Sequence, residues 1–270
     1  MISITVITCT FNASKAIERT LQSVLEQEYD CVEHLLIDGK SKDNTCELIE
    51  RYIIESEAAA NGHTIRFISE PDKGLYDAMN KGLQMATGEY LVFLNAGDTF
   101  PSCHTLQQVA NAVSEGEPLP GVIYGDTDIV DEDGRFLRHR HYSAPDDLSW
   151  KSFLGGMLVC HQAFYALTDI ARVIPYNISY RYSADVDWCI RVMKESASQG
   201  RPLRNTHQVL ANFLDGGMST TNHKASLKER FRVMARHYGL LPTIVQHCRF
   251  VLRAVIVKVK GIISRIIPNL

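Results

Sequence analysis

The sequence of 270 residues predicts an α/β protein with a mostly parallel central sheet. Over the first hundred residues, short β-branched segments alternate with segments of helical periodicity, and this order builds a parallel sheet with helices on both faces. Polar clusters follow the expected strands, at the sheet edge where such proteins bind ligands. The composition, 45% hydrophobic and 22% charged, is that of a globular protein.

The expected elements follow from these periodicities. Strands are expected at residues 3–8, 34–37, 65–68 and 90–94, and helices at 14–28, 45–60 and 75–86. After residue 101 the pattern loosens, and the expected elements are a helix at 106–114, strands at 122–126, 129–138 and 157–160, and helices at 186–196 and 224–238. No repeat or linker divides the chain, so we expect one domain over residues 1–229 and an appendage over residues 230–270.

Charge is unevenly distributed along the chain. The sequence holds 28 basic and 31 acidic residues, yet the part after Glu229 contains eight basic residues and no acidic one. Such a tail is expected to have an anionic partner, either a membrane or nucleic acid. No uncharged apolar run is long enough to cross a membrane, and the N-terminus lacks the basic segment of a signal peptide. Seven scattered cysteines without a CxxC pair indicate reduced thiols in the cytoplasm.

The tail predicts an amphipathic helix. Its apolar face consists of Ile244, Cys248, Val251, Val255, Val259, Ile262 and Ile266, and Arg249, Arg253 and Lys260 lie on another face. Cations beside an aliphatic face are typical of a helix in a membrane interface, although the helix could instead pack on the domain with a solvated basic side. Nucleic-acid binding is disfavoured because Phe250 is the only Phe, Tyr or Trp among the last thirty residues. We therefore expect residues 240–267 to bind the inner face of the cell membrane.

Two polar segments follow the second and third strands. Asp38, at the end of the second strand, could accept hydrogen bonds from a ribose hydroxyl or a base N–H, or it could simply cap the next turn. The segment from Glu70 to Gly82 places acids and bases in a loop and the first turns of a helix, where phosphates bind well. An N-capped surface helix would explain Asp72 alone. The segment is neither a P-loop nor a GxGxxG turn, which disfavours a dinucleotide-binding fold.

A third polar segment, Asn95-Ala96-Gly97-Asp98, directly follows the apolar strand at 90–94. A carboxylate emerging from a buried strand can hold a hard divalent cation whose shell is completed by substrate phosphates and water. The alternative is a plain turn that ends the strand.

Five segments together resemble the family 2 glycosyltransferases of the GT-A fold, which has a Rossmann-like sheet with flanking helices. The resemblance covers roughly residues 2–225 and is closest to bacterial transferases of O-antigen, capsule and colanic-acid type. The segments are Thr8-Cys9-Thr10-Phe11-Asn12, Asp38 to Thr45, Glu70 to Gly82, Asn95 to Asp98, and Ala184-Asp185-Val186-Asp187.

The resemblance implies a donor site for a nucleotide sugar. Thr8, Thr10 and Asn12 would line the nucleotide pocket, Asp38 would bind the base or ribose, and Asp72, Lys73 and Asn80 would line the ribose and phosphates, with Asn95 and Gly97 beside them. Asp98 would hold Mg²⁺ or Mn²⁺. Gly97 stands where many members have a second Asp, so this chain has one carboxylate where others have two.

The resemblance also implies an inverting single displacement. Asp185 would deprotonate the acceptor hydroxyl while the metal stabilises the leaving nucleoside diphosphate; Asp187 would face elsewhere on the following helix, and both could instead be helix caps. His161, Gln162 and Gly217 would contact the acceptor or the diphosphate. His161 could equally be a structural residue, and Gly216-Gly217 could be only a turn.

The implied function is transfer of a sugar to a saccharide acceptor linked to undecaprenyl diphosphate, during synthesis of a bacterial surface polysaccharide. The sequence disfavours two other classes of protein. A nucleotidyltransferase would carry a Gly-rich basic loop after the first strand, which Thr8 to Asn12 do not form. A nucleic-acid-binding protein would need aromatic residues interleaved with the basic ones.

Overall fold

The computed structural model describes residues 1–113, 117–216 and 222–252. The strands are β1 (Ile4–Thr10), β2 (Val32–Asp38), β3 (Thr64–Ser69), β4 (Tyr90–Phe93), β5 (Val122–Val130), β6 (Phe136–His139), β7 (Phe164–Leu167) and β8 (Leu203–Leu214). The helices are α1 (Ile17–Leu25), α2 (Thr45–Ala59), α3 (Leu75–Met85), α4 (Thr105–Asn111), α5 (Thr168–Arg172), α6 (Ala184–Ser198) and α8 (His223–Tyr238), with 3₁₀ turns η1 (Trp150–Gly155) and η2 (His161–Ala163). Residues 240–252 are also helical, after a break at Gly239.

The strands form one mixed sheet in the order β3-β2-β1-β4-β7-β5-β6, and β8 pairs with β5. The predicted parallel arrangement is confirmed for β3, β2, β1 and β4. The second half is mixed, because β7 runs antiparallel to both β4 and β5, whereas β8 runs parallel to β5.

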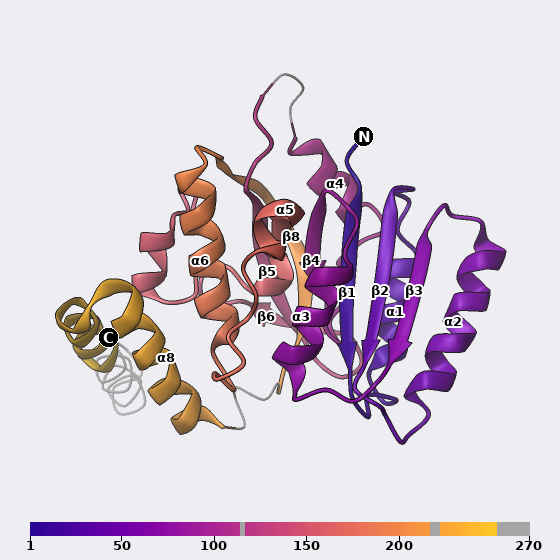
Figure 1. Ribbon diagram of the computed structural model, residues 1–270, viewed down its shortest axis with the longest axis horizontal. Coiled ribbons are helices and arrows are strands. Elements are labelled where there is room, and N and C mark those ends of the chain that lie inside the picture. The colour runs from indigo at the N-terminus through magenta and orange to yellow at the C-terminus, as the bar shows by residue number, and fades with distance from the viewer. Residues whose placement is uncertain (114–116, 217–221, 253–270) are drawn as a thin grey trace, which may run out of the picture.

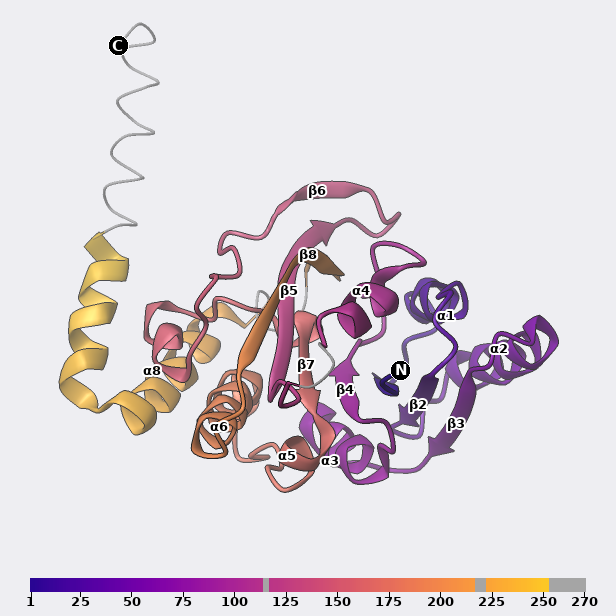
Figure 2. The same ribbon diagram turned by 90° about the horizontal axis from the view of Figure 1, so that it is seen from above.

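Helices cover both faces of this sheet, as the alternating pattern predicts. Figure 2 shows α1 and α4 on one face and α3, α5 and α6 on the other. On the first face, Ile17 and Leu21 of α1 pack with Leu36 of β2 and with Ile49 and Tyr52 of α2. On the other face, the core includes the fully buried Trp188 of α6, which stacks on Tyr176 at 4.8 Å between ring centroids.

The strand expected at residues 157–160 is wrong. That segment has no regular secondary structure, and the strand in this region is β7, which begins four residues later. Arg140 explains the difference, because its guanidinium donates to the carbonyls of Met157 (2.6 Å) and Leu158 (3.1 Å). A side chain therefore satisfies the backbone groups that a neighbouring strand would otherwise pair with.

The boundary expected after Glu229 falls inside α8, which packs against α6 and η1 (Figure 1). On the C-terminal side of that boundary, the ring of Tyr238 stacks on Trp150 at 5.8 Å, and its hydroxyl donates to the Trp150 carbonyl. Residues 230–238 therefore continue a helix that is packed against α6 and η1. In the described part of the chain, no helix is both long and apolar enough to cross a membrane.

Candidate active site

The carboxyl ends of β1, β2 and β3 lie at one edge of the sheet, where the first turns of α3, α6 and α8 also begin (Figure 1). Register aligns Thr10 of β1 with Asp38 of β2, and Asp38 with Ser69 of β3. The ends of three parallel strands therefore bring together polar residues that are far apart in the sequence.

Asp38 is fully buried at this edge and organises it. Its carboxylate accepts hydrogen bonds from the hydroxyls of Thr10 (2.9 Å) and Ser69 (2.7 Å) and from the Ser41 backbone N–H (2.9 Å) and hydroxyl. Burial opposes ionisation, but these hydrogen bonds, led by those from Ser41, outweigh it and lower the pKa of Asp38. Asp38 is thus ionised, and it holds the surrounding backbone and hydroxyl groups in place. A hydrogen bond to a base or ribose would be made in addition to these.

Of the other residues predicted for the nucleotide pocket, Thr8 lies beneath the edge and Asn12 lies on it. The fully buried Thr8 hydroxyl donates to the Leu94 carbonyl (2.8 Å) and fastens β1 to the end of β4. Asn12 is exposed with φ +49°, and its side-chain oxygen accepts the Lys42 N–H at 2.9 Å. Between Thr10 and Asn12, the ring of Phe11 is 63% exposed. Sequence reasoning did not single out Phe11, because an exposed aromatic side chain at a strand end has no signal in hydrophobic periodicity.

The segment before α3 turns sharply toward the ends of β1 and β2. Asp72 accepts the Gly74 N–H (2.8 Å), and its carboxylate lies so close to Gly39 that a Cβ there would clash with it. Lys73 is exposed. Asn80 is engaged by the protein, since its amide donates to the Tyr176 carbonyl (3.0 Å) and accepts the Tyr176 N–H (2.6 Å). The structure therefore leaves Lys73 open to solvent and uses Asn80 to hold the loop before α6.

Asp98 is 4% exposed, at the end of the segment that follows β4. One carboxylate oxygen accepts from the Gln162 amide (2.9 Å) and the other from the Leu214 N–H (3.0 Å). Burial raises the pKa of Asp98 to about 6, against the effect of these hydrogen bonds. Gly97 has φ +101°, and a Cβ there would lie 2.6 Å from Cδ2 of Leu214, so this backbone leaves no room for a second Asp.

A chain of side chains links the end of β4 to α6. The Asn95 amide nitrogen lies 3.1 Å from His161 Nε2, and His161 Nδ1 lies 3.5 Å from Oδ2 of Asp185. Burial opposes ionisation of Asp185, but the contact with His161 outweighs it and lowers the pKa of Asp185. Asp185 is therefore a carboxylate that stays ionised at neutral pH, near the edge where the residues predicted for the donor site lie.

Asp187, two residues further along α6, has a different environment. Its side chain is buried, and its oxygens lie 2.8 Å from Arg191 Nε and 2.7 Å from His237 Nε2 on α8. Both oxygens are thus paired within the protein. Of the two carboxylates of this segment, only Asp185 is linked to the residues that follow β4.

The residues beside Asp98 bear on whether a divalent cation fits here. Buried amide oxygens of Asn95 and Gln162 have no hydrogen-bond partner among the described residues. Like the Asp98 carboxylate, these are oxygen donors, the kind of ligand that suits Mg²⁺ or Mn²⁺. Among the described residues, a group of three His, Cys, Asp or Glu ligand atoms within 4.8 Å of one another is formed by Glu28, Cys103 and His104, which precede β2 and α4; this group does not include Asp98. An ion at Asp98 would therefore depend on substrate phosphates to complete its shell.

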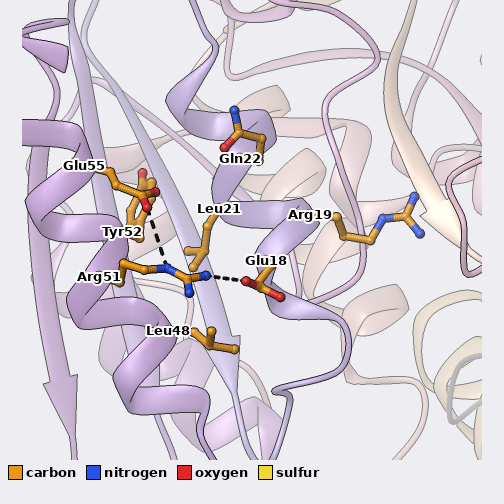
Figure 3. Close-up of a pocket in the computed structure, with 8 residues that line it drawn as sticks. All are labelled: Glu18, Arg19, Leu21, Gln22, Leu48, Arg51, Tyr52 and Glu55. Carbon is orange, nitrogen blue, oxygen red and sulfur yellow. Dashed lines mark hydrogen bonds and ion pairs between the residues drawn. The ribbon is translucent and has the colours of Figure 1, made fainter.

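A groove of about 440 Å³ lies between α1 and α2, away from this edge (Figure 3). Arg51 lies in it between Glu18 and Glu55, with its Nε 3.6 Å from Glu55 Oε1. None of the predicted site residues lines this groove. A second cavity, of about 430 Å³, borders the candidate site and is lined by Ile68, Glu70, Asp77, Asn80, Lys81, Gln84 and Met85.

Comparison with known protein families decides what kind of site this is. The model of glycosyl transferase family 2 matches residues 5–183, which contain the donor-site segments and His161. The chain belongs to glycosyl transferase family 2. As a member of this family, it is a glycosyltransferase.

Relatives within family 2 cover most of the chain. The PGL/p-HBAD biosynthesis glycosyltransferase of Mycobacterium tuberculosis is 31% identical over 214 residues, which cover 78% of this chain and 77% of that protein. The amylovoran biosynthesis glycosyltransferase AmsB of Erwinia amylovora is 28% identical over 222 residues, covering 77% of this chain and 70% of that protein.

Solved structures share the fold at low identity. Staphylococcus aureus TarS in complex with UDP-GlcNAc has a TM-score of 0.66 at 14% identity, over 92% of this chain and 73% of that chain. The mannosyltransferase PcManGT of Pyrobaculum calidifontis, in complex with GDP-Man and Mn²⁺, has a TM-score of 0.59 at 18% identity, over 99% of this chain and 81% of that chain. These likenesses establish the GT-A fold that the sequence predicts.

Proposed function

We propose that this family 2 enzyme transfers a sugar from a nucleoside diphosphate sugar to a lipid-linked saccharide, with inversion at the anomeric carbon. The names of its relatives support a biosynthetic role of this kind, since they include transferases of PGL/p-HBAD and amylovoran biosynthesis. An acceptor linked to undecaprenyl diphosphate would lie at the inner face of the cell membrane.

The observation that carries this proposal is the position of Asp185. It lies in the first turn of α6, at the sheet edge where the donor-site segments end, and His161 keeps its carboxylate ionised. In the proposed step, Asp185 accepts the proton of the acceptor hydroxyl as that oxygen attacks the anomeric carbon. The bond from this carbon to the diphosphate oxygen breaks, and the nucleoside diphosphate leaves with the bonding electron pair.

The donor would lie across the ends of β1, β2 and β3. Thr10, Asn12 and Asp38 would surround the base and ribose, with Thr8 holding β1 in place beneath them. The exposed ring of Phe11 supports this assignment because a planar aromatic side chain can stack on a base. Asp72, Lys73 and Asn80 would flank the ribose and diphosphate, and Asn95 and Gly97 would lie beside the sugar.

A divalent cation would be held by Asp98, with Asn95 and Gln162 supplying amide oxygens. Bound Mn²⁺ in the structurally similar PcManGT supports Mg²⁺ or Mn²⁺ as the ion. Such an ion stabilises the negative charge of the departing diphosphate. Gln162 orients the Asp98 carboxylate at 2.9 Å, and His161 would contact the acceptor or the diphosphate. Gly217, predicted to contribute here, lies outside the described residues.

The C-terminal helix would hold the enzyme at the membrane surface. Of the expected segment 240–267, the structure describes residues 240–252, in which Leu241, Ile244, Val245 and Leu252 are between 42% and 73% exposed. Thr243 and His247 instead turn inward, where His247 contacts the ring of Phe231 on α8. An exposed apolar stripe on a helix that also carries the exposed Arg249 supports binding to an anionic lipid surface.

Asp185→Asn tests the base assignment. The variant keeps a side chain of the same size, so we expect nucleotide binding to be retained while transfer falls by about two to four orders of magnitude. Asp169→Asn is the matched control, because Asp169 is an exposed carboxylate in the first turn of α5, at the other end of the sheet. Near-normal transfer by a folded Asp185→Asn enzyme would show that Asp185 is not the base.

A further inference from the structure

A carboxylate on α8 holds the segment that leads into α6. Glu229 accepts hydrogen bonds from three consecutive backbone N–H groups, those of Arg181 (2.9 Å), Tyr182 (2.6 Å) and Ser183 (2.7 Å). The two segments are more than 45 residues apart in the sequence. Glu229 also lies beyond residue 183, where the match to the family model ends.

These bonds cap the backbone just before α6, not the first N–H groups of the helix itself. The first N–H groups of a helix lack partners within the helix and are commonly satisfied by the side chain of the N-cap residue. Ser183 is the N-cap residue of α6, yet its side chain makes no capping bond in the described structure. Glu229 satisfies the N–H groups on the approach to α6 instead, and a negative charge near a helix N-terminus is itself favourable.

The capped segment leads directly into the turn that carries Asp185. Ser183 is fully buried, and its hydroxyl donates to the Ser226 carbonyl of α8 at 3.5 Å. Helix α8 therefore contacts Ser183 through both Glu229 and Ser226. Asp185 follows two residues later, which leaves little freedom between the capped backbone and its carboxylate. The pairing of His237 with Asp187 attaches α8 to α6 about two helical turns further along α8 and does not involve residues 181–183.

We propose that Glu229 is a positioning residue that fixes the geometry of Asp185 by capping residues 181–183 from α8. The inference rests on the proposed role of Asp185 as the base. Loss of this cap would let the start of α6 shift, and a displacement of about 1 Å at a reacting group can cost up to a hundredfold in rate. Binding of the nucleotide sugar would change little, because the donor residues lie on other elements.

Glu229→Ala and Glu229→Gln in the full-length enzyme test this role. For Glu229→Ala we expect faster hydrogen exchange over residues 181–186 and a kcat at least tenfold lower, with the donor KM within about twofold of the unaltered enzyme. Glu229→Gln should recover part of kcat, since an amide oxygen still accepts N–H bonds. His237→Ala is the matched control: it removes another buried contact between α8 and α6 and should lower stability without this loss of kcat.

A double variant separates this inference from the assignment of the base. If Glu229 acts through Asp185, Glu229→Ala should reduce transfer no further in the Asp185→Asn background. Unchanged kcat in Glu229→Ala, or a loss equal to that of His237→Ala, would overturn the positioning role even if Asp185 is the base. If Asp185→Asn is active and Glu229→Ala lowers its kcat further, Glu229 does not act through Asp185.

Discussion

The Asp187 carboxylate on α6 lies 2.7 Å from His237 Nε2 on α8, and both side chains are almost completely buried. Asp185, two residues earlier, faces His161 instead. One helical turn therefore directs two carboxylates to different neighbours: one joins the C-terminal helix to the body, and the other lies at the candidate site. Their variants should differ accordingly.

Asp187→Ala should destabilise the protein by about 3 kcal/mol, because it leaves His237 and Arg191 without their buried partner. Burial opposes ionisation of Asp187, but His237 and Arg191 lower its pKa. The stabilisation is therefore present above the ordinary Asp pKa and is lost as pH falls below about 4. Denaturant unfolding of the unaltered protein and of Asp187→Ala at pH 7 and pH 3.5 measures this. The difference in their free energies of unfolding should be smaller at the lower pH. A gap that widens would contradict the assignment.

Asp98→Asn should abolish any dependence of nucleotide binding on Mn²⁺. With a carboxylate at Asp98, we expect Mn²⁺ to tighten binding of UDP or GDP at least tenfold in calorimetric titrations, because an ion held by Asp98 would supply positive charge to the diphosphate. The variant should bind the nucleotide equally with and without Mn²⁺, whereas Asp169→Asn should behave like the unaltered enzyme. Transfer that persists in EDTA would rule out the metal role of Asp98.

His34 should make the folded state sensitive to acid. It is fully buried between the Thr8 hydroxyl (3.0 Å) and the Tyr52 hydroxyl (2.8 Å), and burial lowers its pKa to about 3. Between pH 6.5 and pH 3 the unfolded chain binds a proton at this site that the folded chain does not. As the pH is lowered through this range, the free energy of unfolding therefore decreases by up to about 1.4 kcal/mol per pH unit. His34→Gln should reduce this slope; equal slopes for this variant and the unaltered protein would contradict the prediction.

Gly97→Ala should destabilise the protein by at least about 2 kcal/mol. Its φ of +101° is unfavourable for a residue with a Cβ, and that Cβ would meet Cδ2 of Leu214 at 2.6 Å. Adding Leu214→Ala should remove the clash but leave the backbone strain. The double variant should therefore regain only part of the stability that Gly97→Ala loses. Gly155→Ala is the control, since nothing lies within 4 Å of its Cβ position. Thermal unfolding of these variants measures the effect.

Leu241→Asp should weaken binding to vesicles that contain anionic lipid by about tenfold or more, which corresponds to the transfer free energy of one leucine side chain. Ile54→Asp on α2 is the matched control, because the two side chains are similarly exposed, at 73% and 66%. Vesicle flotation compares the two variants with the unaltered chain. Equal flotation of both variants, or binding to single-stranded nucleic acid without binding to lipid, would contradict the membrane assignment.

The first half of the fold could be predicted because its signals are local. Strand β1 is a run rich in β-branched residues, β2 contains the aliphatic stretch from Leu35 to Ile37, and α1 and α3 have clear helical periodicity. The strands β7 and β8 could not be predicted in the same way. Only Leu210 and Ala211 of the twelve residues of β8 are buried, and its pairing with β5 is irregular, so neither run length nor alternation marks it as a strand.

For the site, residue order alone reveals which residue types follow each strand and which segments resemble family 2. It also determined the uneven charge that sets the C-terminal part of the chain apart. The tertiary structure decided which of these residues are free to act: Asp38 and Asn80 hold the backbone around them, Asp187 pairs with α8, and Asp185 meets His161. It also assigned to Glu229 a contact with residues 181–183. These outcomes depend on the packing of elements far apart in the chain, because a carboxylate's partners are set by its neighbours in space.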